Sequence, residues 1–310
     1  MSRIVILGPQ RLKPTVGEAV RRRQIRGPIS LITAGWQERE MEDQELRDEL
    51  GLPCVNLRLY ERWEEILRED REFFHAHRAR QDLLRQVRHF YQRRLNHLME
   101  QANEVFTMNA SDELLEPERR DVIASLQALD AHYLRRVAEI NEEFEWSWRP
   151  ASRPAVARHR RQVAQQLLGG DAVMMAGGHI AVILLRLRLF ELAPLLRRRM
   201  IFAWSAGAMA LTERVVLFHD TPPQGRGYAE VFEHGLALIP NVVVLPNARR
   251  RLRLDDIHRV ELMARRLAPA RCIPLDEGEG FEWYEGEVDI LPANGLRELT
   301  RDGQVQEVHP

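Results

Sequence analysis

The chain is poor in cysteine and in long apolar runs. Only two of its 310 residues are cysteine, Cys54 and Cys272, and their spacing fits neither a metal site nor a framework of disulfides. We therefore expect two reduced thiols. The longest apolar run, around 180–187, is interrupted by Arg186 and is too short for a membrane span. Residues 3–7 are too short for the core of a signal peptide. These absences predict a soluble, cytoplasmic protein.

The chain also lacks an excess of charge of either sign. Lys and Arg together number 45 and Asp and Glu together number 46, which gives a formal net charge of -1. This balance argues against a protein that binds nucleic acid, which would be basic overall or in one block. Hydrophobic residues make up 45% of the chain, enough for a substantial core. The length predicts one large domain or two ordinary ones.

Short apolar segments alternate with helical segments in two parts of the chain. Such alternation is typical of a parallel sheet whose strands are joined by covering helices, so the predicted fold class is α/β. Helices are expected over 16–24, 38–50 and 180–198. The expected strands cover 3–7, 29–33, 54–59, 171–175, 200–204, 214–218 and 241–246.

The pattern changes between these two parts. Residues 62–109 contain neither glycine nor proline, and their apolar residues recur at three- and four-residue steps, as they do again over 122–144. These stripes predict two long amphipathic helices in an antiparallel hairpin, with Pro117 in the first turn of the second. We therefore divide the chain into an α/β domain made of 1–61 and 161–310, and a helical hairpin insertion over 62–160.

The hairpin must bury its apolar stripes against some surface. The two helices can cover each other, the α/β body can cover them, or a second subunit can. At about 1.5 Å per residue, the longer helix would extend past a body of this size. The stripe continues to Val122 and Leu126 near the tip, where we expect it to be exposed. A homodimer through the hairpin is the expected assembly.

One serine lies where an apolar segment gives way to small residues. In Ala203-Trp204-Ser205-Ala206-Gly207, the strand expected over 200–204 runs directly into a helix. A serine on such a turn presents its hydroxyl at the C-terminal edge of the strand and can act as a nucleophile. Serine is also a good helix cap, so this pentapeptide alone leaves both roles open.

A glycine pair ends the preceding strand. Ala176-Gly177-Gly178-His179 follows 171–175, and the ends of adjacent parallel strands meet at the edge where ligands bind. The backbone N–H groups of Gly178 and Ala206 are therefore candidates for an oxyanion hole beside Ser205. A simple tight turn is the alternative explanation of the glycine pair.

Together these segments resemble the dipeptidase E and cyanophycinase family of serine peptidases, which have a class I glutamine amidotransferase-like (flavodoxin-like) fold. The resemblance implies that Ser205 is the nucleophile of a hydrolase acting on a peptide or related amide bond. It also implies that Asp220, fifteen residues later, is the acid of a catalytic triad. It covers 169–268 and rests on the glycine pair, on Ser205-Ala206-Gly207-Ala208, on Gly-Leu-Ala-Leu-Ile-Pro over 235–240 and on the Arg-rich 249–254.

The chain departs from this family at the residue that should be the general base. Family members end the strand after the Gly-Leu segment in Pro-His, whereas this chain has Pro246-Asn247. An asparagine amide has no useful basicity near neutral pH, so Asn247 cannot take the proton of Ser205. The candidates to replace the base are His179, which we favour because it follows the glycine pair, His219 and His234.

Two classes of function remain open. The chain is either a serine hydrolase, or an inactive member of the family that binds a ligand or recruits a partner through its hairpin. Arg249 and Arg251 are candidates for binding an acidic substrate. A solvent-exposed connection between a strand and a helix would explain these arginines equally well. No metal or organic cofactor is implied, since His75 and His77 face different sides of the expected helix. The expected partner is a peptide-like small molecule, and neither nucleic acid nor a membrane.

Overall fold

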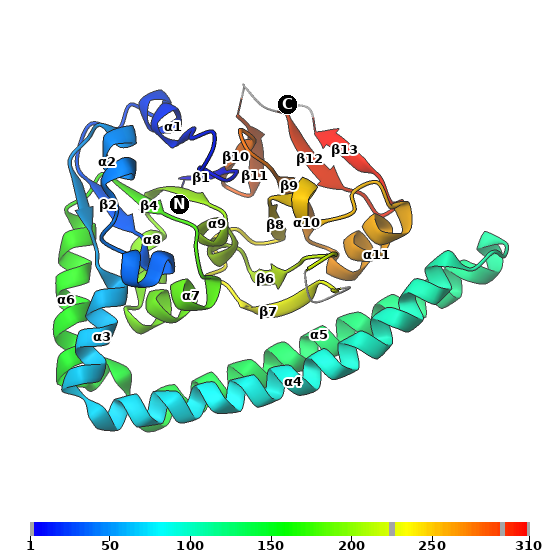
Figure 1. Ribbon diagram of the computed structural model, residues 1–310, viewed down its shortest axis with the longest axis horizontal. Coiled ribbons are helices and arrows are strands. Elements are labelled where there is room, and N and C mark those ends of the chain that lie inside the picture. The colour runs from blue at the N-terminus through cyan, green and yellow to red at the C-terminus, as the bar shows by residue number, and fades with distance from the viewer. Residues whose placement is uncertain (1–2, 223–226, 292–294, 309–310) are drawn as a thin grey trace.

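The computed structural model describes residues 3–222, 227–291 and 295–308. Within these residues the largest sheet has seven strands, in the order β11-β10-β1-β5-β4-β2-β3 (Figure 1). The five strands from β1 to β3 in this order are parallel, and β10 and β11 are antiparallel. The strands are β1 (Arg3–Leu7), β2 (Ile29–Ile32), β3 (Cys54–Asn56), β4 (Ala172–Met175), β5 (Met200–Trp204), β10 (Gly280–Tyr284) and β11 (Glu287–Ile290).

Helices cover both faces of this sheet, because successive residues of each strand point to opposite faces. Val5 and Leu7 pack with α1 and α2 in one core, whereas Ile4 and Ile6 belong to the larger core on the other face. The predicted α/β class, with a parallel-rich sheet flanked by helices, is confirmed. The first face carries α1 (Val16–Arg22) and α2 (Gln44–Leu50), and the second carries α3 (Leu59–Glu69), α6 (Pro154–Leu168), α7 (Ile180–Leu189), α8 (Leu192–Leu196) and α9 (Ala206–Leu211).

The parallel pattern expected for the second half of the chain holds only as far as β5. The next strand, β6 (Arg214–Leu217), pairs antiparallel with β7 (Glu230–His234) outside the main sheet. β8 (Val242–Pro246) joins a separate sheet in the order β13-β12-β9-β8, in which β8 and β9 are parallel. The other strands of this sheet are β9 (Arg271–Leu275), β12 (Leu296–Leu299) and β13 (Val305–Val308).

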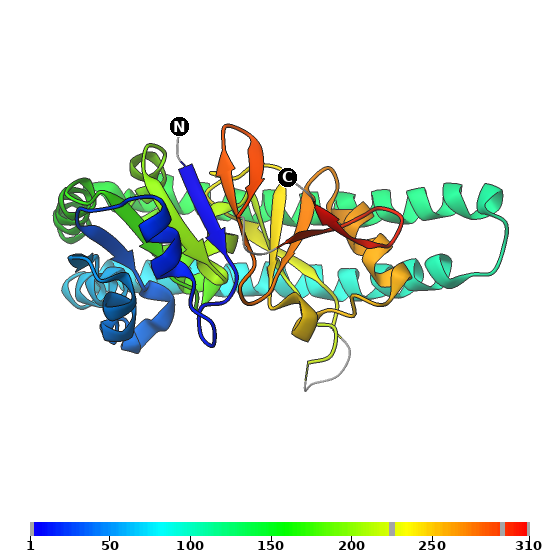
Figure 2. The same cartoon turned by 90° about the horizontal axis from the view of Figure 1, so that it is seen from above.

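The expected helical hairpin is present and consists of two helices of 37 residues each, α4 (Arg71–Thr107) and α5 (Asp112–Trp148). Figures 1 and 2 show it running along the α/β body, with its tip extending past α11 (Ile257–Leu267). The first expected helix is divided at Asp70, whose carboxylate accepts a hydrogen bond from the Phe73 N–H at 3.0 Å and so caps α4. Before this break, α3 packs with α6 on the body.

The apolar stripe near the hairpin tip is covered within the chain. Val122 and Leu126 are buried in a cluster formed by α4, α5 and Leu262 of α11. The expectation that they are exposed is therefore wrong. The hairpin lies against the body for much of its length instead of projecting freely, so α11 supplies the surface that the sequence pattern alone does not indicate.

Several expected helix boundaries differ in the structure. Pro117 lies inside α5, which begins earlier, at Asp112. The helix expected over 38–50 is a 3-10 segment, η1 (Ala34–Arg39), followed by α2. The helix expected over 180–198 is broken at Glu191, which has a positive φ of 49°. The remaining short helices are η2 (Pro150–Ser152) and α10 (Ala248–Arg251).

Both cysteines are free thiols, and Cys272 is buried. In the three described ranges, no helix has both the length and the apolar character needed to cross a membrane.

Candidate active site

Ser205 is the single residue between β5 and α9. Its backbone has φ 50° and ψ −125°, a conformation that residues other than glycine rarely adopt and that costs about 1–3 kcal/mol. The strand before Ser205, β5, pairs with β1 on one side and with β4 on the other. The Ser205 carbonyl accepts the first hydrogen bond of α9, from the Met209 N–H at 3.0 Å. The strand and the helix together therefore hold the strained turn, and Ser205 lies where the sequence predicted a strand-to-helix junction.

Two glycines allow neighbouring backbone to approach this turn. A Cβ on Gly177 would lie 2.8 Å from the Ser205 Cβ and 3.5 Å from its Oγ. A Cβ on Gly207 would lie 2.4 Å from the Met175 carbonyl oxygen. Any larger residue at either position would push α9 away from the end of β4. The glycine pair that follows β4 and the serine that follows β5 are thus brought into contact.

The two backbone groups predicted to form an oxyanion hole are available. Among the described residues, neither the Gly178 nor the Ala206 N–H has a hydrogen-bond acceptor. The next N–H along the chain, that of His179, donates to the Gly35 carbonyl at 2.8 Å and fixes the turn. The N–H groups of Gly178 and Ala206 are therefore free to donate hydrogen bonds to a ligand.

A cavity of about 450 Å³ opens at Gly178 and His179. Its other walls come from α4, α5, α7 and the β6–β7 pair, and we call it the hairpin cavity. On the hairpin side it is lined by Gln81, Arg88 and Tyr133, among others. The Gln81 Nε2 and Arg88 Nε atoms are buried and have no hydrogen-bond partner among the described residues. Sequence reasoning did not find these residues, because no motif indicates which part of an amphipathic helix will face a distant glycine turn.

His179, the favoured substitute base, is exposed at the start of α7. Its Nδ1 accepts a hydrogen bond from the Val182 N–H at 3.4 Å and so caps this helix. A neutral imidazole with an accepting Nδ1 carries its proton on Nε2. In this arrangement one ring nitrogen of His179 is occupied by the helix cap and the other carries the proton.

Asp220, predicted to be the triad acid, is buried and bound by arginine. Arg259 donates to its Oδ1 through Nε at 3.0 Å and through Nη2 at 2.7 Å. The Arg253 N–H donates to its Oδ2 at 2.9 Å. In the part of the chain that the structure describes, no histidine bonds this carboxylate.

The register of the main sheet places the end of β1 beside Ser205. Leu7 pairs with Trp204, so Gly8 follows at the level of Ser205. A Cβ on Gly8 would lie 1.9 Å from the Asp276 carbonyl oxygen, so the segment after β9 lies directly against this point. The edge that holds Ser205 is thus shared by the loops that follow β1 and β9.

Asn247, at the expected histidine position, follows β8 in the second sheet. Its N–H donates to the Leu275 carbonyl, at the end of β9, at 2.8 Å. Its backbone is left-handed, with φ 58° and ψ 41°, a conformation that asparagine and histidine tolerate better than most residues. Asn247 therefore lies against the end of β9, and its side chain bonds no other described residue.

The two arginines predicted to bind substrate follow Asn247 in α10. The Arg249 side chain is 69% exposed, and the nearest acids to it are Asp276 and Glu279, each at 3.7 Å. Arg251 is exposed, and its carbonyl accepts from the Asp220 N–H at 2.8 Å. Asp276 and Glu279 were not predicted, and both also pair with Arg297.

The other histidines considered as bases lie on the β6–β7 side of the body. His219 follows β6, and its Nδ1 is buried without a hydrogen-bond partner among the described residues. His234 ends β7, and its carbonyl accepts from Arg188. Across the described ranges, no group of three or more His, Cys, Asp or Glu residues is placed to hold a metal ion.

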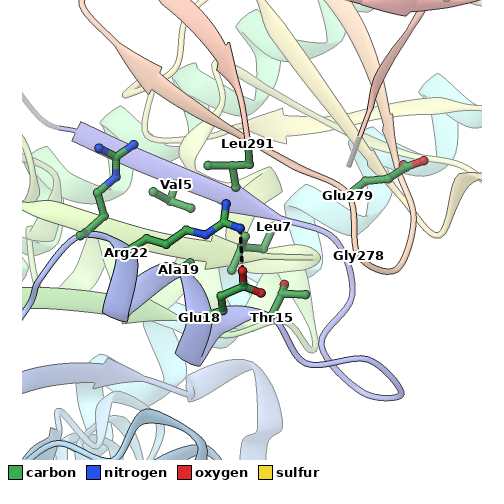
Figure 3. A pocket seen from close by; sticks show the side chains of 10 residues that line it. Val5, Leu7, Thr15, Glu18, Ala19, Arg22, Gly278, Glu279 and Leu291 are labelled. Carbon is green, nitrogen blue, oxygen red and sulfur yellow. Dashed lines mark hydrogen bonds and ion pairs between the residues drawn. The ribbon is translucent and has the colours of Figure 1, made fainter. Parts of the chain in front are cut away.

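A smaller cavity of about 230 Å³ lies beside β1, on the face covered by α1 (Figure 3). Val5, Leu7 and Leu291 supply its apolar side. Glu18 and Arg22, which pair at 2.6 Å, stand at its rim. It shares no lining residue with the hairpin cavity, and Ser205 lines neither of the two.

Among solved structures, a crystal structure of a peptidase from an acI-B1 Actinobacterium is similar in fold, with a TM-score of 0.49. Its sequence is 11% identical, and the match covers 99% of this chain and 94% of that chain. No protein-family model and no curated protein sequence matches this chain. An identity this low says nothing about individual site residues.

Proposed function

We propose that this chain is a serine hydrolase that acts on a peptide or related amide bond, of the dipeptidase E and cyanophycinase type. The observation that carries the proposal is the strained backbone of Ser205 at the end of β5, with φ 50° and ψ −125°. A helix cap needs no such strain, because capping residues normally have extended backbone. Strain of this kind persists where the surroundings impose it and is concentrated at active sites.

In the proposed reaction, the Ser205 Oγ attacks the substrate carbonyl carbon. The carbonyl oxygen becomes an oxyanion, which the free N–H groups of Gly178 and Ala206 stabilise. Collapse of this intermediate breaks the C–N bond. The amine leaves with the proton given up by the Ser205 hydroxyl, and the acyl group stays on Ser205 until water hydrolyses it to the carboxylic acid. The hairpin cavity, which begins at Gly178, would hold the part of the substrate next to the scissile bond.

Among the described residues, no side chain of this site is placed to accept the proton of the Ser205 hydroxyl. Asn247 stands where the family has its histidine, Asp220 is bound by Arg259, and the accepting nitrogen of His179 is occupied by the helix cap. We therefore propose slow acylation. Sites that lose a triad member retain about 10³–10⁴-fold rate enhancement over water through the oxyanion hole and binding alone.

A second candidate is a binding protein that does not turn over its ligand. The specific observation that favours it is the buried ion pair between Asp220 and Arg259. The Asp220 side chain is only 3% exposed and the Arg259 side chain only 6%. An acid held in this way supports the fold near α10 and does not orient a base. The cavity and the free N–H groups would then bind a peptide-like ligand without chemistry.

Turnover of a mixture of dipeptides and short peptides by three variants tests the proposal. We expect slow hydrolysis by the wild type, none by Ser205→Ala, and faster hydrolysis by Asn247→His, since histidine tolerates the left-handed backbone at this position. Adding Ser205→Ala to Asn247→His should remove the gain. Hydrolysis that survives Ser205→Ala contradicts the proposal, and rapid hydrolysis by the wild type shows that another residue serves as base.

A further inference from the structure

A second large cavity, of about 440 Å³, lies where the hairpin joins the body. We call it the base cavity. Its walls come from α3, α4, α5, α7 and α8, and they are mostly apolar, with Trp63, Phe144 and Leu187 among them. None of the residues predicted for the active site lines it, so a ligand there would be distinct from the proposed substrate.

One arginine in this cavity has no acidic partner. The Arg80 guanidinium lies over the Phe144 ring, 4.1 Å from its centroid. Its Nε is buried without a hydrogen-bond partner, and Arg80 forms no ion pair within 4 Å among the described residues. Burial lowers the pKa of Arg80 to about 10. Arg80 is partly buried, and a positive charge partly shielded from water without a partner favours a ligand that carries a negative charge.

A second arginine of this kind stands on the other side of the same aromatic cluster. Arg186 is buried and lies over Trp63, 4.6 Å from the ring centroid, again without an ion pair within 4 Å in the described ranges. His77 lies in the same cluster, with its ring centroid 4.4 Å from that of Trp63. Burial, Arg80 and Arg186 lower the pKa of His77 to about 3. Of these three residues, Arg80 and His77 line the base cavity, and Arg80 is the one that faces it as a cation.

The acids that line the base cavity do not cancel the charge of Arg80. Glu191 is mostly exposed and pairs with Arg160 at 2.6 Å. Glu145 lies near Arg80 but forms no ion pair with it, and burial raises its pKa. A carboxylate brought in by a ligand would face aromatic walls and an unpaired guanidinium, which binds carboxylates through two parallel hydrogen bonds.

We propose that the base cavity binds a small aromatic or branched aliphatic carboxylate, whose carboxylate meets Arg80 and whose apolar part lies among Trp63, Phe144 and Leu187. The volume suits a ligand of modest size, and the lining combines many apolar groups with a few polar ones, as small-molecule sites do. This site does not depend on whether Ser205 is a nucleophile.

Calorimetric titration of the full chain with 3-phenylpropionate, and with 3-phenylpropionamide as the neutral control, tests this proposal. We expect saturable binding of the carboxylate and binding at least about tenfold weaker for the amide, since a hydrogen bond to a charged group is the stronger kind. Arg80→Gln should weaken carboxylate binding by a similar factor. Arg78→Gln, which removes an exposed arginine of the same helix, should leave it unchanged.

A further variant keeps the test decisive if Arg80→Gln does not fold. Glu145→Gln removes the acid nearest to Arg80 and should tighten binding of 3-phenylpropionate. If instead Glu145 is the partner of Arg80 in solution, the wild type will show no saturable binding and the proposal fails. Equal binding of acid and amide, or binding that is unchanged in Arg80→Gln, also overturns it.

Discussion

At the scale of single residues, the backbone of Ser205 is the feature that most needs explanation. Its strain is imposed by neighbours, since Gly177 admits the serine side chain and Gly207 lets α9 close over the end of β4. Capping residues normally have extended backbone, so capping of α9 alone does not account for this conformation. Strain of this kind is consistent with the proposed role of Ser205 at the edge of the sheet.

His77 gives a prediction about pH. Its pKa is lowered to about 3 by burial and by two arginines, so it stays neutral in the folded state, whereas in the unfolded chain it binds a proton below about pH 6.5. Its contribution to stability is thus complete above about pH 6.5. That contribution is lost progressively as the pH falls toward 3, by at most about 1.4 kcal/mol per pH unit.

Urea unfolding between pH 5 and pH 7 checks this. The wild type should lose more stability toward pH 5 than His77→Gln does, whereas His75→Gln, which removes an exposed histidine of the same helix, should behave as the wild type. Identical pH dependence in the wild type and His77→Gln would show that His77 is not held neutral.

The residues of the candidate site were predictable to different degrees. Ser205 could be located because an apolar strand runs directly into small residues, which is a local pattern. The partner of Asp220 could not be located, because Arg259 lies 39 residues away on α11 and no spacing rule connects the two. Gln81 and Arg88 were missed for the same reason, since the hairpin reaches the cavity through tertiary packing alone.

At the scale of secondary-structure elements, the hairpin is fixed to the body by a buried polar network. Asp130 of α5 accepts hydrogen bonds from Arg266 of α11 at 2.7 and 2.8 Å and from the Tyr91 hydroxyl of α4 at 2.8 Å. Arg266 also donates to the Ala229 carbonyl, just before β7, at 2.7 Å. The Tyr91 and Tyr133 rings stack with centroids 4.2 Å apart. Hairpin, α11 and β7 are thus joined at one point, which holds the hairpin wall of both cavities in place.

Removing one member of this network should be costly. Asp130→Asn leaves the buried Arg266 charge without its partner, so we expect a loss of about 3–5 kcal/mol in the free energy of unfolding by urea. Asp130→Leu combined with Arg266→Met removes both charges and should lose less than either single change. Arg136→Gln breaks an exposed pair with Glu139 and should cost no more than about 0.5 kcal/mol. A loss for Asp130→Asn as small as that for Arg136→Gln would show that the network does not hold the hairpin.

The elements themselves were predicted unevenly. The hairpin was evident because its apolar stripes are long and uninterrupted by glycine or proline. The break between α3 and α4 at Asp70 and the break at Glu191, which has a left-handed backbone, were not evident. Each depends on the conformation of a single residue within a helical pattern. The strand β8 was expected, but an apolar segment does not show which sheet it joins, and β8 pairs with β9 outside the main sheet.

At the scale of the whole molecule, the hairpin covers one side of the body (Figures 1 and 2). Two cavities are lined by residues of the hairpin and of the body together. Its stripes are buried by α4, α5 and α11 together. This accounts for most of the apolar surface that suggested a homodimer. What remains exposed on the hairpin includes Leu83 and Phe90, one heptad apart on α4, which are 51% and 66% exposed.

A homodimer through this face of α4 remains a prediction. Light scattering at micromolar concentration should give the full chain a molar mass twice that of one chain. Phe90→Asp should reduce this molar mass to that of one chain. His132→Asp, at an exposed position of α5, serves as the matched control and should leave the dimer intact. A wild type with the mass of one chain contradicts the homodimer.

The central claim, that Ser205 is the nucleophile of a slow hydrolase, is tested most directly by covalent labelling with a fluorophosphonate, followed by intact mass measurement and peptide mapping. The account predicts slow addition of one phosphonyl group per folded chain, located on Ser205. Labelling should be absent from Ser205→Ala and from the urea-unfolded wild type, and faster in Asn247→His. No adduct on the folded wild type, or an adduct on any other residue, would contradict it.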